Sequence, residues 1–142
     1  MNKYQKLKII KTTKNLLDLD NSFFIGIDLS DCSLTSIDFS YINLTGANFA
    51  DSKIKRCIFN TTNLTKVNLS NSVLIGSIFT NAIMIETNLS SVNMKNSILN
   101  RAILSNSNFT NANLKNIDFA ECFISTIDLT NAKLKDVKNI QI

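Results

Sequence analysis

Three cysteines carry the most reactive side chains of this sequence, which contains no histidine. A thiol can act as a nucleophile, as half of a disulfide or as a zinc ligand. Cys32, Cys57 and Cys122 lie far apart and form neither a Cys-x-x-Cys motif nor a disulfide framework. Each stands two residues before a large apolar residue, so we expect small buried side chains without a redox or metal-binding role.

No other group of residues has the spacing of a catalytic site. The commonest general base, histidine, is missing, and the chain has no phosphate-binding loop, dinucleotide fingerprint or nucleophile elbow. The neighbouring carboxylates Asp18 and Asp20 are expected to be ordinary surface groups. The sequence therefore predicts a protein that is not an enzyme and uses neither a metal nor another cofactor.

Lysine is the remaining side chain that could bind a charged ligand, and its distribution is uneven. Residues 1–17 contain five lysines and no acidic residue, whereas residues 18–142 contain ten basic and eleven acidic residues, a net charge of −1. The overall charge of +4 thus belongs mostly to a short N-terminal segment.

The elements that position these residues are short and periodic. Every fifth residue from Leu19 to Leu134 is Leu, Phe, Ile or Met, the residue two before it is usually small, and the residue between is mostly Asn or Asp. This alternation places the large and small residues on one side of an extended backbone, and the two following residues have the composition of a turn. A short period kept over so many units predicts a solenoid.

Units such as ANFAD at 47–51, VNLSN at 67–71 and ANLKN at 112–116 resemble the pentapeptide repeat family, whose motif is A-(D/N)-L-x-x. The resemblance implies an all-β fold, a right-handed quadrilateral β-helix with four units per coil and about six coils. We expect residues 1–16 to form a basic N-terminal cap or tail, which is either a short helix or an irregular segment. The β-helix should span residues 17–137, and residues 138–142 should form a short C-terminal end. The largest core side chains would be Phe39, Phe49, Phe59, Phe79, Phe109 and Phe119.

Isoleucine stands at several outer positions where Asn or Asp is expected. With four units per coil, residues 20 apart lie in one column, and two adjacent sides then share an apolar edge made of Ile58, Ile78, Ile98, Ile83, Ile85 and Ile103. A contiguous exposed apolar surface usually marks an interface, although chance substitution in an isoleucine-rich chain stays open. We expect a rigid scaffold or interaction module that self-associates or binds a protein of unknown identity through this edge. A second copy sealing the C-terminal coil is another route to an oligomer.

Two other partners stay open. A lysine stripe on another side could bind nucleic acid or an acidic partner, or be merely solvated, and it consists of Lys53, Lys55, Lys95, Lys115, Lys133 and Lys135. Nucleic acid is the less expected partner because no aromatic residues interleave for base stacking. The family resemblance implies an alternative, since some pentapeptide repeat proteins imitate DNA and bind DNA gyrase or topoisomerase. Those members resemble acidic rods, commonly dimerised through a C-terminal helix, whereas this repeat body is nearly neutral.

The same sequence favours a cytoplasmic location. No apolar run is long enough to span a bilayer, and the N-terminal lysines are not followed by the apolar stretch of a secretory signal. We therefore expect no membrane-spanning segment.

Overall fold

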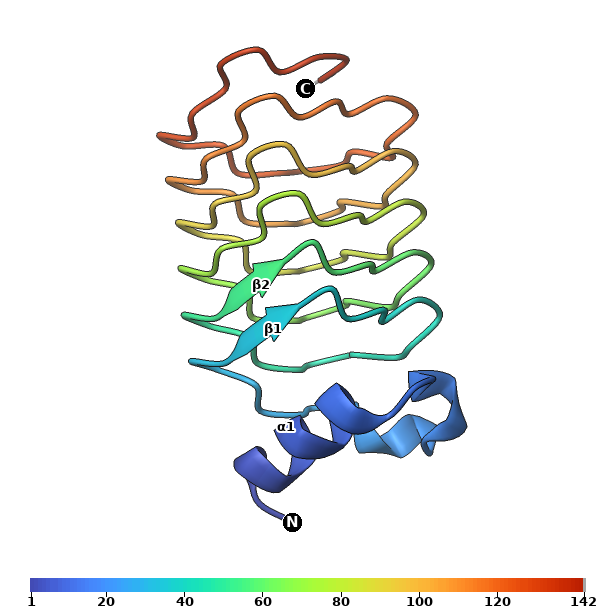
Figure 1. Ribbon diagram of the computed structural model, residues 1–142. Coiled ribbons are helices and arrows are strands. Elements are labelled where there is room, and N and C mark those ends of the chain that lie inside the picture. Colours follow the sequence, from blue (N-terminus) through green and yellow to red (C-terminus); the bar gives the residue numbers. More distant parts are fainter. Residues whose placement is uncertain (142) are drawn as a thin grey trace.

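The computed structural model describes residues 1–141 and shows a stack of coils standing on a short helix (Figure 1). Backbone pairing between coils is parallel and joins residues 20 apart, as in the bridges Asn48–Asn68 and Asn68–Asn88. One coil therefore takes 20 residues, or four five-residue units. The prediction of a pentapeptide repeat solenoid with four-sided coils is confirmed.

Regular strands are few. Two short segments pair in parallel, β1 (Ser33–Thr35) and β2 (Lys53–Lys55), with Leu34 opposite Ile54. The other backbone pairs between coils in the described residues are isolated bridges. The all-β description is thus correct for the backbone pairing between coils, but few residues lie in regular strands. The reason is that a turn interrupts the extended backbone in every unit.

That turn contains a left-handed residue two positions after each large residue. Its φ is positive in every unit from Gly26 (62°) to Asp136 (57°). The N–H of this residue bonds to the next coil, as from Asp51 to the carbonyl of Ser70 at 3.0 Å. Glycine and asparagine are the usual residues at such angles, yet threonine, with its β-branch, occupies the position at Thr61 (55°). The corners of the coils therefore follow from backbone hydrogen bonding more than from residue type.

Large apolar side chains fill the interior of the coils. The six phenylalanines expected in the core are all buried: Phe39, Phe49, Phe59, Phe79, Phe109 and Phe119. Three of them stack along one side, with ring centroids 5.2 Å apart between Phe39 and Phe59 and 4.9 Å apart between Phe59 and Phe79. The distance between stacked rings thus matches the distance between adjacent coils, which is about 4.8 Å in a β-sheet.

The small inner position bonds the coils together when it carries a hydroxyl. Thr62 Oγ1 donates to the carbonyl of Phe39 at 2.7 Å, and Ser97 Oγ donates to that of Leu74 at 2.7 Å. Cys122 occupies the equivalent place, with its Sγ 3.0 Å from the carbonyl oxygen of Leu99. The expected burial of the cysteines is confirmed for Cys32 and Cys57, whereas Cys122 is half-buried.

The N-terminal end of the stack is covered by α1 (Lys3–Thr12), as Figure 1 shows. Asn2 and Gln5 form a capping box that satisfies the first amides of the helix, and Ile10 is buried against the core. Two single turns of 3-10 helix follow, η1 (Leu16–Asp18) and η2 (Asn21–Phe23). The first bond between coils comes from the N–H of Gly26 to the carbonyl of Thr45, so regular coiling begins after these turns.

The C-terminal end of the described chain lacks a comparable cover. Leu134, which occupies an inner position, is 40% exposed, and Ile124, Leu129 and Val137 are only partly buried. Within residues 1–141, no helix has the length and hydropathy needed to cross a membrane.

Candidate interaction surfaces

The outer residue just before each large residue closes the turn when it is Asn or Asp. Its Oδ1 accepts the N–H of the residue two positions later, as in the pairs Asn48–Ala50, Asn68–Ser70 and Asn108–Thr110, at 2.9–3.1 Å. The same bond forms at every Asn or Asp in this position from Asp28 to Asp128. These Asx turns give each such N–H an acceptor within its own unit.

One side of the solenoid carries Asn or Asp in this position throughout, and adjacent coils are also linked there by side chains. Asn88 Nδ2 donates to Asn68 Oδ1 and Asn48 Nδ2 donates to Asp28 Oδ1, both at 3.3 Å. The polar column therefore has a structural role, because its oxygens are used within the chain.

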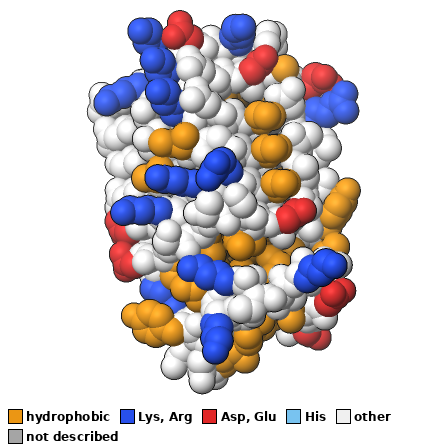
Figure 2. Space-filling view, in the orientation of Figure 1, with side chains coloured by type: hydrophobic (Ala, Val, Ile, Leu, Met, Phe, Trp, Pro, Cys, Tyr) orange, Lys and Arg blue, Asp and Glu red, His pale blue; other side chains and the backbone are white. Residues whose placement is uncertain are grey.

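Isoleucine interrupts this pattern on two adjacent sides. Ile58, Ile78 and Ile98 lie in one column and pair through successive bridges. The second column contains Ile83, Ile103 and then Phe123; Ile85 lies two positions after Ile83. The structure thus stacks five of the six isoleucines of the apolar edge in two columns, and Figure 2 shows a row of hydrophobic side chains running along the coils.

The exposure of this edge is uneven. Ile98 is 44% exposed and Phe123 is 64% exposed, whereas the other five isoleucines of the edge are partly buried. Each inner member of a column is flanked by side chains of the coils before and after it. The apolar edge is therefore a shallow surface with its most exposed groups toward the C-terminal coils.

Backbone donors accompany the isoleucines. Because an isoleucine side chain accepts no hydrogen bond, the Asx turn is missing, and the N–H groups of Thr80, Asn100 and Ser105 make no hydrogen bond within residues 1–141. The same holds for the N–H groups of Asn60 and Ile85. Sequence reasoning missed these donors, although the replacement of Asn by Ile was the available signal.

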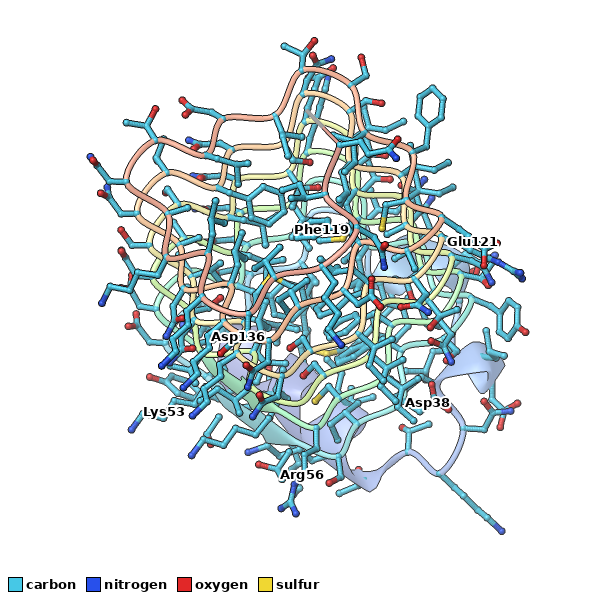
Figure 3. All side chains as sticks on the ribbon, turned by 90° about the horizontal axis from the view of Figure 1, so that it is seen from above. Asp38, Lys53, Arg56, Phe119, Glu121 and Asp136 are labelled. Carbon is cyan, nitrogen blue, oxygen red and sulfur yellow. The ribbon has the colours of Figure 1, made fainter. Side chains whose placement is uncertain are left out.

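A corner carrying both charges lies between the two columns. Arg101 Nε is 2.8 Å from Glu121 Oε2, and both side chains are well exposed. A second exposed pair, Lys66 with Glu86, joins neighbouring coils at 3.7 Å on the next corner. Figure 3 shows Glu121 on the outside of the coils, on the opposite side from Lys53, with Phe119 in the interior.

The lysine stripe also lies on one side, but it is broken. Lys53 and Lys55 flank buried Ile54 in β2, and the remaining members are Lys95, Lys115, Lys133 and Lys135. Val73 pairs with both Lys53 and Asn93, so at least one coil of this column carries an apolar residue. None of the six lysines forms an ion pair in the part of the chain that the structure describes.

The pockets and the thiols give no indication of a catalytic site in the described residues. A depression of about 520 Å³ at the C-terminal end is lined by residues that include Glu121, Cys122 and Phe123.

Burial raises the pKa of the thiols of Cys32 and Cys122, and it raises the pKa of Cys57 to about 11. A raised thiol pKa leaves little thiolate to act as a nucleophile. Residues 1–141 contain no group of three His, Cys, Asp or Glu side chains that could hold a metal ion.

Comparison with known families identifies the repeat. A family model described as a pentapeptide repeat region matches residues 72–139, and a model of pentapeptide repeats in eight copies matches residues 18–51 and 27–65. No protein among the curated sequences matches the chain.

Several solved structures are similar. A pentapeptide repeat protein from the thylakoid lumen of Arabidopsis thaliana is 28% identical, with a TM-score of 0.65 over 66% of each chain. A pentapeptide repeat protein from the cyanobacterium Cyanothece 51142 is 14% identical, with a TM-score of 0.58 over 97% of this chain and 96% of its own. HetL, a pentapeptide repeat protein of Nostoc involved in regulating heterocyst differentiation, is 18% identical, with a TM-score of 0.50 over 81% of this chain and 56% of its own.

Proposed function

This chain belongs to the pentapeptide repeat family, and on that premise we propose that it is a non-catalytic interaction module that self-associates through its apolar edge. The observation that carries the proposal is the column Ile58, Ile78 and Ile98 on consecutive coils. On the opposite side of the solenoid, every coil has Asn or Asp in the equivalent position. Each isoleucine removes an internal hydrogen bond and adds apolar surface, which favours an interface.

A second copy of the chain suits this edge better than an unrelated surface. The apolar groups repeat at the coil spacing of about 4.8 Å, and a second solenoid presents groups at the same spacing. The corner between the columns holds Arg101 and Glu121 on successive coils. A surface with both charges side by side can match itself across a two-fold axis.

Light scattering of the purified protein tests the proposal. We expect the wild type to be a dimer or larger and the double variant Ile78→Asp/Ile98→Asp to be a monomer, since it introduces charge into the interface. The control Asn68→Asp/Asn108→Asp adds the same charge on another side, keeps both Asx acceptors and leaves the bond from Asn88 Nδ2 to residue 68 in place, so it should still associate.

Two results would contradict the apolar edge as the interface. One is a wild type that remains monomeric at high concentration. The other is that the Ile78→Asp/Ile98→Asp variant still associates while the Leu134→Asp variant does not. That outcome would indicate that the interface lies at the C-terminal coil.

A second candidate function is the binding of a polyanionic partner at the lysine stripe. The observation in its favour is that Lys95, Lys115 and Lys135 stack on successive coils without acidic partners in the described chain. Affinity for such a partner would fall steeply with salt. Imitation of DNA is less favoured, because the repeat body is close to neutral.

A further inference from the structure

The apolar edge presents backbone donors that its own chain does not use. In units with Asn or Asp before the large residue, the N–H two positions later is bonded, as in Ser90 N to Asn88 Oδ1 at 3.1 Å. In units with isoleucine there, the N–H groups of Asn60, Thr80 and Asn100 have no acceptor within residues 1–141. The edge is therefore a ladder of apolar side chains with an unused donor beside each one.

Three of the residues with such unused N–H groups also carry side-chain acceptors. Thr80, Asn100 and Ser105 are partly exposed, and the oxygen atoms of their side chains make no hydrogen bond in the described part of the chain. Donor and acceptor thus belong to the same residue, and they recur at the coil spacing in Thr80 and Asn100, which lie 20 residues apart, with Ser105 in the unit that follows Asn100. A second copy, turned by a two-fold axis, offers acceptors to these donors and donors to these acceptors at the same spacing.

We propose that the N–H groups of Thr80, Asn100 and Ser105 donate hydrogen bonds to side-chain oxygens of a second copy, and that Ile78, Ile98 and Ile103 shield these bonds from water. The inference rests on the proposed self-association and adds the chemistry of recognition. Hydrogen bonds sheltered by apolar groups are stronger than those in water. The isoleucine columns then define both the place of the interface and its register, because slipping by one coil leaves the end donors unpaired.

The double variant Ile78→Asn/Ile98→Asn tests this directly, since it restores the Asx acceptors for Thr80 and Asn100. We expect it to remain folded, with a thermal midpoint no lower than that of the monomeric wild type, and to lose association. The matched variant Ile78→Val/Ile98→Val leaves the donors unused by the chain and keeps the surface apolar, so its dissociation constant should stay within about tenfold of the wild type.

Amide hydrogen exchange, resolved by residue with NMR, provides the second measurement. The amides of Thr80 and Asn100 should exchange at least about tenfold more slowly in the assembled wild type than at dilutions where it is monomeric. The amide of Ser90, already bonded to Asn88, should show no such dependence on concentration.

The outcomes separate the two proposals. If the wild type associates but the amides of Thr80 and Asn100 exchange equally fast in monomer and assembly, the donors are not used and this inference is wrong, while self-association stands. If the Asn variant associates as tightly as the wild type, the inference is also wrong. A wild type that stays monomeric overturns both proposals.

Discussion

Stacking of Phe59 between Phe39 and Phe79 makes this ring the most informative core position to perturb. The ring planes of Phe59 and its two neighbours lie within 9° and 3° of parallel. Phe109 is equally buried, but it forms no ring pair among the residues that the structure describes. Comparing Phe59→Leu with Phe109→Leu therefore separates stacking from burial.

The expected magnitudes follow from these contacts. Leucine already fills many of the inner positions, so Phe109→Leu should behave as a moderate core change and cost about 1 kcal/mol. Each aromatic pair contributes roughly 0.5–1.5 kcal/mol beyond burial. Phe59→Leu breaks two pairs and should lower the free energy of unfolding by about 1–3 kcal/mol more than Phe109→Leu.

Urea denaturation of the two variants and the wild type, followed by circular dichroism, measures the difference. Equal losses for the two variants, within about 0.5 kcal/mol, would refute the reasoning. The slopes of the transitions must also agree, because repeat proteins can unfold in parts. A double-mutant cycle of Phe59→Leu with Phe79→Leu should then give a coupling of about 0.5–1.5 kcal/mol.

Three further predictions concern the turns, the thiols and the lysines. Thr61→Asn should raise the free energy of unfolding by about 1 kcal/mol, because asparagine tolerates a left-handed backbone better than a β-branched residue does. Thr65 does not have a positive φ, so the control Thr65→Asn should not raise it. Thermal melts of both variants measure the difference. Since burial raises the pKa of Cys57 to about 11, the folded state keeps a proton that the unfolded chain releases, and stability should fall by up to about 2 kcal/mol as the pH rises from 9 to 11. The variant Cys57→Ser should lack this loss in urea titrations. If the lysine stripe binds polyanions, Lys95→Glu/Lys115→Glu should elute from heparin at lower salt and show a shallower salt dependence, and unchanged elution would count against the stripe.

The spacing of the large residues was sufficient to predict the coil and its interior. Phe59 and Phe79 are 20 residues apart and both must point inward, so a four-unit coil places them on one side. Strand content could not be predicted in the same way, because it depends on how long the backbone stays extended between turns. Nothing in the residue type marks Arg101 or Glu121 as left-handed, yet both have positive φ.

The candidate site was predictable in outline only. The sequence places Ile58, Ile78 and Ile98 in one column, which the structure shows as paired residues. It does not reveal that Ile78 is partly buried while Ile98 is exposed, because that difference depends on neighbouring coils. The unused N–H groups depend on the hydrogen bond between an Asx side chain and a residue two positions later, which requires the turn geometry.

The twenty-residue coil also restricts how a protein of this kind can change its length. Losing or gaining a whole coil leaves every column in line, so the surface keeps its pattern and only the rod becomes shorter or longer. Losing a single five-residue unit between Ile58 and Ile78 would still fill the core, but it would rotate everything that follows by one side of the solenoid. Ile78 would then stand in the column of Lys53, and Ile83 would take its place beside Ile58. Insertions and deletions are therefore neutral for the surface only in multiples of four repeats, and a one-repeat change reassigns the surface while the core stays intact.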